Sequence, residues 1–479
     1  MNNKISKKDK FFSKILEYML YLFVFVLPWQ TRWIFKDYRV GENFFEFGRM
    51  GLYAFDLIIL AMLLIFLLAK SIRVKFTNII SKAEGIGLSI FIILLAVMAY
   101  SAWFFAIDSE IAHYWLTRFV VAFLLLLLIL KINFSQIKLI VAFVTSACLQ
   151  ALLGIWQVIH NEVMANKWLG MAWHQADALA GESVIAYGDE RLLRAYGSLP
   201  HPNILAGFLV VVFAMLIYLI LKTEKSWQRW FLFSSFSLIL SGIFLTFSRS
   251  AWLATLGVII FLFAVFAHKS TYDTRRLAKA LGAWAIILVT ILSLLFLAPL
   301  KTRILGDGRL EEISFTERSA SMRNAYYIAL NHTPRGVGLG NYVQEVRRLD
   351  RDSLPISLYQ PVHNVYFLAW AELGLVGGIS MLLLLLYFCA RMVAAKEDQF
   401  TGYPLPLLIS GSAMGVVFFL MFFDHYFWTT AFGIYLWFFV MGFFMRNIGI
   451  NKDEVLPKEQ LLYKKISCLH DENSSRRDS

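Results

Sequence analysis

The sequence predicts an all-α fold, a polytopic helix bundle embedded in a membrane. Of its 479 residues, 59% are hydrophobic and only 16% are charged, whereas soluble domains are about a quarter charged. The apolar residues form blocks of roughly 18 to 25, the length that a helix needs to cross about 30 Å of hydrocarbon. Because every backbone polar group must be satisfied inside lipid, these blocks are expected to be helices.

The apolar blocks predict about twelve transmembrane helices, from a first at 12–29 to a last at 427–445. The first block is too long for a cleaved signal peptide, and it lacks small residues at its end, so we expect it to stay as a span. The boundary between the seventh and eighth spans, around Arg249, is the least defined because few residues separate them. The other ranges are 52–69, 86–105, 115–130, 138–159, 203–221, 230–247, 251–267, 280–299, 364–388 and 404–423.

The distribution of basic residues predicts the orientation. Lys and Arg are frequent at residues 4–10 and in the connections predicted on the same side of the membrane as these residues. The connection 106–114, predicted on the opposite side, has neither. This asymmetry places both termini in the cytoplasm. We expect residues 1–450 to form one membrane domain and the polar segment 451–479 to be a disordered cytoplasmic tail. The net charge of +12 then reflects topology, and no nucleic-acid partner is expected.

Two long connections, 160–202 and 300–362, are predicted on the outer side. Long connections are uncommon unless they are functional, so a site facing away from the cytoplasm is expected. The second connection carries eight arginines but one lysine. Guanidinium groups match phosphate oxygens bidentately and stay protonated, which favours a phosphate-bearing lipid head group. Solvated helix residues balanced by nearby Asp and Glu are the alternative for most of these arginines.

Within the second connection, residues 314–331 are predicted to form an amphipathic helix with Arg318 and Arg323 on its flanks. A glycine-rich stretch, Gly336–Gly340, and then Asn341 follow it. Since no Lys-Ser/Thr follows these glycines, they indicate a structural turn rather than a phosphate loop. The expected apolar stripe of the helix consists of Ile313, Met322, Tyr326, Ile328 and Ala329.

His363 is the candidate catalytic base. It enters the predicted tenth span, and Asn364 and Tyr366 add hydrogen-bonding groups beside it. An imidazole accepts a proton from a hydroxyl near neutral pH, although a lone interfacial histidine is often structural. Arg249 is a second polar outlier, which either faces a polar cavity or reaches the outer interface as a turn residue.

A third cluster ends the first long connection and leads into the sixth span. It contains Arg194, His201 and Asn203, which we predict either to form a second wall of the outer pocket or to serve helix entry with Asn203 as the cap. The three cysteines lie outside the predicted outer loops, so no structural disulfide is expected there. No Cys and His residues have the spacing of metal ligands, so neither a metal nor a cofactor is expected.

Four ordered motifs resemble those of the bacterial O-antigen ligase and polymerase superfamily. They are RAYGSLPHPN at 194–203, FSRSAW at 247–252, PRGVGLGNY at 334–342 and HNVYFLAWAELGLVGG at 363–378. The resemblance covers roughly residues 195–378. It implies a metal-independent, inverting glycosyltransferase of the bacterial inner membrane, which moves a glycan from undecaprenyl diphosphate to an acceptor hydroxyl, such as that of lipid A core, on the periplasmic face.

The resemblance also implies roles for residues. His363 would activate the acceptor hydroxyl, and Arg249 with a loop arginine, either Arg318 or Arg323, would hold the diphosphate. A polymerase, whose acceptor is a lipid-linked glycan, is the alternative within the superfamily. A lipid-linked oligosaccharide transporter is the alternative from another class, but the few charges within the spans and the long loop disfavour it. The expected pocket residues are Arg194, His201, Asn203, Asn341, Asn364 and Tyr366.

Overall fold

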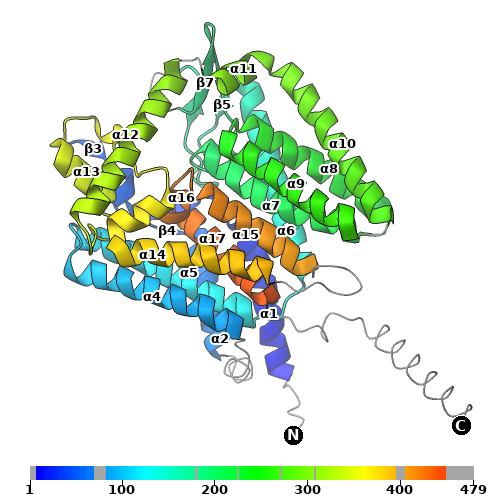
Figure 1. Cartoon of the computed structure of the whole chain (residues 1–479), viewed down its shortest axis with the longest axis horizontal. Coiled ribbons are helices and arrows are strands. Elements are labelled where there is room, and N and C mark those ends of the chain that lie inside the picture. The colour runs from blue at the N-terminus through cyan, green and yellow to red at the C-terminus, as the bar shows by residue number, and fades with distance from the viewer. Residues whose placement is uncertain are drawn as a thin grey trace, which may run out of the picture.

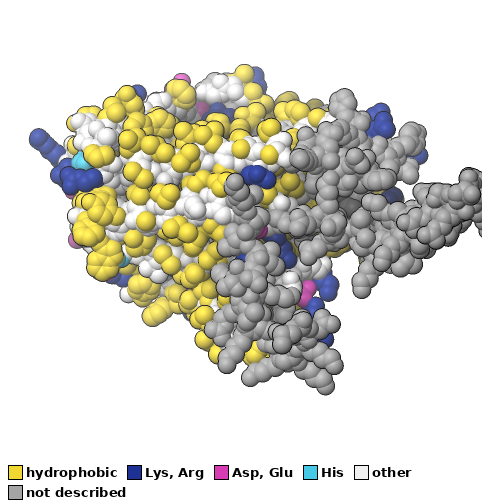
Figure 2. Space-filling model, turned by 60° about the horizontal axis from the view of Figure 1, so that its bottom comes forward, with side chains coloured by type: hydrophobic (Ala, Val, Ile, Leu, Met, Phe, Trp, Pro, Cys, Tyr) yellow, Lys and Arg dark blue, Asp and Glu magenta, His cyan; other side chains and the backbone are white. Residues whose placement is uncertain are grey.

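The chain folds into a predominantly helical bundle (Figure 1). The computed structural model describes residues 7–68, 82–178, 182–223, 226–269, 272–306, 309–394 and 405–448. The predicted tail at 451–479 lies outside the described residues. Hydrophobic side chains cover most of the described surface in the view of Figure 2, and charged side chains gather mainly toward its edges. Such a surface is expected of a protein surrounded by lipid.

A helix covers most of each of the twelve predicted spans. By length and composition, eight helices of the described chain are able to cross a membrane, and three apolar helices are shorter. A multi-pass membrane fold is therefore confirmed, while the number of twelve spans stays a prediction. The helices are α1 Lys7–Val26, α2 Ala54–Leu68, α4 Lys82–Phe104, α5 Ser109–Lys131, α6 Gln136–His160, α7 Pro202–Lys222, α8 Ser226–Leu245, α9 Arg249–Lys269, α10 Tyr272–Leu295, α14 Val365–Val393, α15 Leu405–Leu420 and α17 Ala431–Ile448.

Contacts between distant segments define one end of the bundle as the place where the long connections meet. The hydroxyl of Ser198, just before α7, donates to the carbonyl of Pro28 after α1 at 2.9 Å. The backbone N–H of Val365, which starts α14, donates to the carbonyl of Met421 after α15 at 2.8 Å. The entries of α7 and α14 and the exits of α1 and α15 therefore lie together.

Short strands accompany the helices, so the all-α expectation is incomplete. Four antiparallel pairs occur among the described residues, all of them in connections between helices. Each strand has at most five residues, too few to give a clear alternating pattern in sequence. The pairs are β1 Arg32–Lys36 with β4 Met50–Tyr53, β2 Arg39–Val40 with β3 Asn43–Phe44, β5 Glu162–Val163 with β6 His174–Gln175, and β7 Val184–Tyr187 with β8 Glu190–Leu193.

The second long connection is partly helical, as predicted, and its helices extend beyond the predicted range 314–331. It contains α11 Leu297–Leu305, α12 Arg309–Asn331 and α13 Tyr342–Asp350, and α12 runs down to pack on α14 (Figure 1). The expected apolar stripe is only partly right, because Ile313 and Tyr326 are exposed. Ala325, which was not expected there, is buried with Ile328 and Ala329 at helical spacing.

The glycine-rich turn stabilises a break in α14. Gly374 has φ 66° and ψ −160°, a conformation open to glycine and strained for other residues. Helical hydrogen bonding is lost there, and the N–H of Leu375 donates instead to the carbonyl of Pro334 at 3.0 Å. A side chain on Gly374 would collide with that carbonyl. The Gly336–Gly340 segment is therefore a structural turn packed against the break.

Candidate functional site

A polar cavity of about 510 Å³ lies at the end of the bundle where α7 and α14 begin. One part of its lining consists of His201, His363, Asp424 and His425, which precede or follow membrane helices. Another part comes from the segment 30–53, between α1 and α2. Residues from distant parts of the chain thus converge on one cavity, as expected for a ligand site.

The first turn of α14 fixes the position of His363. Asn364 is the N-cap, and its side-chain oxygen accepts from the N–H groups of Tyr366 and Phe367 at 3.0 and 3.1 Å. The Tyr366 hydroxyl donates to the carbonyl of Phe418 in α15 at 3.1 Å. Asn364 and Tyr366, which were predicted as pocket residues, do not line the cavity and instead hold the helix end in place, whereas His363 lines the cavity. Its Nδ1 is buried and has no hydrogen-bond partner among the described residues.

Asp424 and His425 lie beside His363 and were missed from the sequence. They separate α15 from the short helix α16, Tyr426–Thr429. The rings of His363 and His425 meet edge to face with centroids 5.1 Å apart. Asp424 is buried, and its Oδ1 accepts from the backbone N–H of His425 at 2.8 Å. Two adjacent ionisable residues between apolar blocks were a detectable signal, the same one that drew attention to Arg249.

Asn203 connects Arg194 to Asp424. Its side-chain oxygen accepts from Arg194 Nη2 at 2.7 Å, and its amide nitrogen donates to Asp424 Oδ2 at 3.0 Å. Arg194 also donates through Nε to the carbonyl of Thr246 at 2.6 Å. Buried Arg194 therefore positions the wall of the cavity from behind, and Asn203 transmits that position to Asp424.

The predicted capping role of Asn203 is wrong. His201 is the N-cap of α7, and its Nδ1 accepts from the Asn203 N–H at 3.1 Å. Pro202 occupies the first helical position, which its fixed φ favours, so the cap is His201, two residues before Asn203. Since Nδ1 is an acceptor, the proton of neutral His201 is on Nε2, which donates to the Ser183 hydroxyl at 2.9 Å.

Four arginines, Arg194, Arg249, Arg303 and Arg318, interact electrostatically with one another and are called the arginine cluster. Two of them share the carboxylate of Glu311. Arg249 Nη2 lies 3.0 Å from Glu311 Oε2, and Arg303 forms an ion pair with the other oxygen of Glu311. Arg303 also donates to the carbonyl of Phe247 at 2.9 Å. The half-buried guanidinium of Arg318 has no hydrogen-bond or ion-pair partner in the described part of the chain.

Arg318 acts electrostatically on both the cluster and the cavity. The pKa of Arg194 is lowered mainly by burial, and the positive charges of Arg303 and Arg318 lower it further. Burial also lowers the pKa of His363, and Arg318 lowers it further against the opposing effect of Asp424. Arg318 is thus close enough to influence two groups of residues that the sequence separates widely.

The protonation states follow from these surroundings. Burial, with His363 and Arg318 adding to it, lowers the pKa of His425 to about 4. Burial would raise the pKa of Asp424, but the neighbouring imidazoles and the Asn203 hydrogen bond outweigh it and lower the value to about 2. At neutral pH the cavity therefore contains an ionised Asp424 beside neutral histidines.

Two predicted site residues lie elsewhere. Arg323 is exposed on α12. Asn341 is fully buried, and its side chain exchanges hydrogen bonds with the backbone of Asp108 at 2.6 and 3.1 Å, so it fixes the turn before α5 outside the cavity. Other loop arginines are paired with carboxylates: Arg347 with Asp352 and Arg348 with Glu345. The pairing agrees with the alternative of charge-balanced arginines, but Arg347 is largely buried and Glu345 fully buried rather than solvated.

His363, Asp424 and His425 also form the one group in the described residues with potential metal-ligand geometry, their ligand atoms lying within 4.8 Å of one another. Hydrogen bonds already engage several of these atoms. Both Asp424 oxygens accept, from Asn203 and from the His425 N–H, and His425 Nδ1 lies 2.6 Å from the Thr429 hydroxyl. The Asp424 oxygens and His425 Nδ1 are thus already engaged in hydrogen bonds, whereas His363 Nδ1 has no partner among the described residues.

Comparison with known proteins identifies one family. Residues 234–382 match the family model described as O-antigen ligase. The matched segment includes Arg249, Arg303, Arg318 and His363, whereas the motif at 194–203 precedes it. The match confirms the resemblance to the O-antigen ligase and polymerase superfamily. No curated protein matches the chain.

Proposed function

We propose, from the membership of residues 234–382 in the O-antigen ligase and polymerase superfamily, that this membrane enzyme transfers a glycan from undecaprenyl diphosphate to an acceptor hydroxyl. The acceptor is lipid A core or another surface molecule, and the reaction takes place at the periplasmic face of the bacterial inner membrane. The observation that carries the proposal is the position of Arg318, whose guanidinium has no partner among the described residues and influences both His363 and the arginine cluster.

The arginine cluster supplies the charge that the donor needs. Four guanidinium groups and the Glu311 carboxylate leave a net charge of three positive. A diphosphate diester carries two negative charges, and a third develops on the leaving group as its bond to the sugar breaks. Preorganised cations that meet developing charge stabilise the transition state. Arg194 is bound to Thr246 and Asn203, so we assign the phosphate contacts to Arg318, which has no described partner, and to Arg249, whose partner Glu311 is shared with Arg303. Exposed Arg323 is not assigned a contact.

His363 acts as the base. The acceptor oxygen attacks the anomeric carbon, the carbon–oxygen bond to the diphosphate breaks, and the hydroxyl proton moves to His363. The low pKa of His363 keeps the imidazole neutral and ready to accept that proton. Ionised Asp424 then stabilises the imidazolium. Attack from the face opposite the diphosphate inverts the anomeric centre.

His363→Ala tests this mechanism in a deletion strain complemented with the variant. Loss of the general base should reduce glycan transfer by about 10²- to 10⁴-fold, seen as loss of long surface glycans on gels. The amount of protein in the membrane, measured by blotting, controls for folding. Normal surface glycan in cells that contain the variant would disprove the role of His363.

The deletion strain itself separates the two members of the superfamily. Polymer that accumulates on the lipid carrier while the acceptor stays bare indicates a ligase. Acceptor that carries single repeat units indicates the polymerase instead. Lipid-linked glycan trapped on the cytoplasmic side would support a transporter and contradict the proposed transfer.

A further inference from the structure

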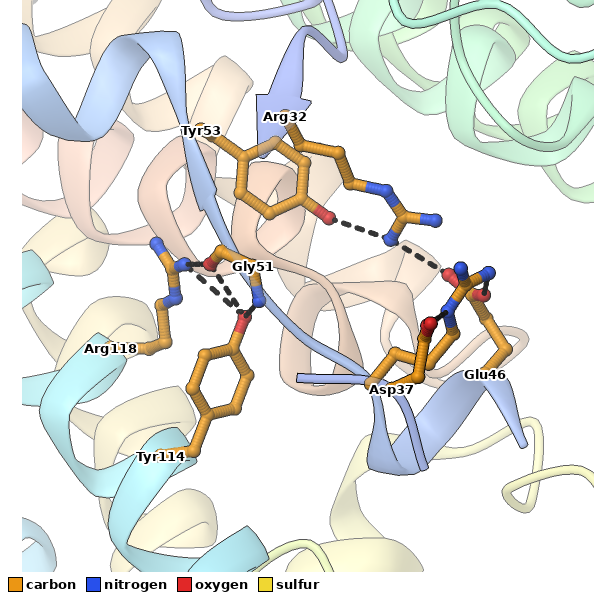
Figure 3. A network of polar contacts seen from close by, with 8 residues as sticks. Arg32, Asp37, Glu46, Gly51, Tyr53, Tyr114 and Arg118 are labelled. Carbon is orange, nitrogen blue, oxygen red and sulfur yellow. Dashed lines mark hydrogen bonds and ion pairs between the residues drawn. The ribbon is translucent and has the colours of Figure 1, made fainter. Parts of the chain in front are cut away.

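The cavity that contains His363 has a second polar wall, formed by the segment between α1 and α2 (Figure 3). Glu46 bridges two arginines there: one oxygen lies 2.8 Å from Arg32 Nη1 and the other 3.2 Å from Arg49 Nη1. Arg49 Nε also binds Asp37 at 2.9 Å. We call Arg32, Glu46 and Arg49 the bridged wall, because one carboxylate connects both guanidinium groups. Asp37 does not line the cavity.

The charges that line the cavity cancel. Arg32 and Arg49 are balanced by Glu46 and Asp424, and burial contributes most to keeping His201 and His425 neutral by lowering their pKa values to about 3 and 4. An anionic ligand would have to compete with Glu46 for guanidinium groups that are already paired. The arginine cluster, in contrast, has an excess of positive charge. The cavity is therefore suited to an uncharged ligand.

The bridged wall offers both donors and acceptors. Guanidinium groups donate in a fixed planar arrangement and the carboxylate accepts, whereas a sugar hydroxyl does both. Aromatic rings line the same cavity, and they include Tyr53, Tyr114 and the largely buried Trp115. The apolar face of a sugar ring packs on such rings. The volume of about 510 Å³ lies within the range of about 300–1,000 Å³ that is typical of small-ligand pockets.

We propose that the bridged wall is the acceptor subsite and binds an uncharged sugar whose hydroxyl reaches His363. A ligand that fills the cavity contacts both His363 and Glu46, because both line it. The inference rests on the proposed function for its assignment to the acceptor. It adds that the two substrates bind at sites of different net charge. The anionic donor head group binds at the positively charged arginine cluster, and the neutral sugar binds in the cavity, whose charges cancel.

Saturation-transfer NMR on the full chain in nanodiscs tests the subsite directly. The probes are the neutral and acidic oligosaccharide fractions released from the surface glycans of the source cells. The neutral fraction should bind, and Glu46→Gln should weaken binding about 10-fold, which corresponds to about 1.4 kcal/mol, because an uncharged amide replaces the charged hydrogen-bond acceptor. The control is Asp37→Asn, which removes the other carboxylate on Arg49 from outside the cavity and should leave binding unchanged.

Several results would overturn the subsite. They are binding of the acidic fraction alone, no binding of the neutral fraction, or equal losses in Glu46→Gln and Asp37→Asn, which would give the network a structural role only. Melting temperatures identify a folding defect. If Glu46→Gln has one, Arg32→Gln replaces it and must show the same loss.

His363→Ala separates the two proposals, because it should abolish transfer while keeping oligosaccharide binding. Transfer that survives this variant would overturn the proposed mechanism and leave the sugar site standing. Sugar binding that is insensitive to Glu46, together with transfer that depends on His363, would overturn the subsite alone.

Discussion

The arginine cluster and the bridged wall are both rich in arginine, yet they differ in how those arginines are paired. In the bridged wall, Glu46 pairs with both guanidinium groups, and Asp37 from outside the wall also binds Arg49. In the cluster, Glu311 is shared by two arginines, and Arg318 has no described partner. The comparison teaches that the number of arginines does not identify an anion site. The excess of guanidinium over carboxylate does.

The variant expected to reveal the difference between the two regions most clearly is at Arg318. Arg318→Ala should reduce glycan transfer by about 10²- to 10³-fold, the usual loss when one preorganised donor to a developing charge is removed. Arg323→Ala, five residues along the same helix but exposed, should have little effect. Transfer is measured in complemented cells at matched protein levels.

Equal losses in these two variants would show that α12 attracts the donor by its overall charge rather than through Arg318. An added Arg318→Lys variant sharpens the result. It keeps the charge and loses the bidentate geometry, so partial activity is expected.

A smaller effect, on the pH profile, tests whether the cluster reaches the cavity. The base must be neutral, so activity is lost as pH falls through the pKa of His363. Burial and Arg318 lower that pKa, and Asp424 raises it. Arg318→Gln should therefore move the acidic limb of the profile to higher pH, and Asp424→Asn should move it to lower pH.

The opposite signs of these two shifts serve as the internal control. A general loss of stability would move the acidic limb in the same direction in both variants. The pKa values of about 2 for Asp424 and about 4 for His425 keep both groups in one protonation state between pH 5 and 8. Profiles of transfer by purified enzyme, each normalised to its own plateau, give the measurement. Shifts of the same sign would break the proposed link.

Much of the fold was predictable because each apolar block is a local signal, and a helix occupies each predicted span. The strands were not predictable, because pairs as short as β2 and β3 have almost no periodicity. His363 and Arg249 stood out as polar residues at the ends of apolar blocks. Asn341 belongs to a recognisable motif, but its side chain forms hydrogen bonds with the backbone of Asp108 and does not face the cavity.

The convergence of residues was beyond the sequence. Asp424 meets His363 only because the start of α14 and the end of α15 are joined, where the Val365 N–H donates to the carbonyl of Met421. Arg318 is half-buried and Arg323 is exposed, although both belong to α12. The bridged wall depends on the pairing of β1 with β4, which sets Arg32 opposite Tyr53. Such long-range contacts carry no local signature.

The smallest expected effect concerns metal ions, and it asks whether arginines alone supply the positive charge. If the cluster neutralises the diphosphate, treatment of the purified enzyme with EDTA should leave transfer unchanged, since no ion is needed to stabilise the leaving group. The alternative is an ion held by His363, Asp424 and His425, whose ligand atoms are close enough together. If EDTA abolished activity and one divalent metal restored it, that ion rather than the arginine cluster would stabilise the diphosphate leaving group. It would also give the cavity a positive charge and thereby remove the electrostatic contrast between the two regions.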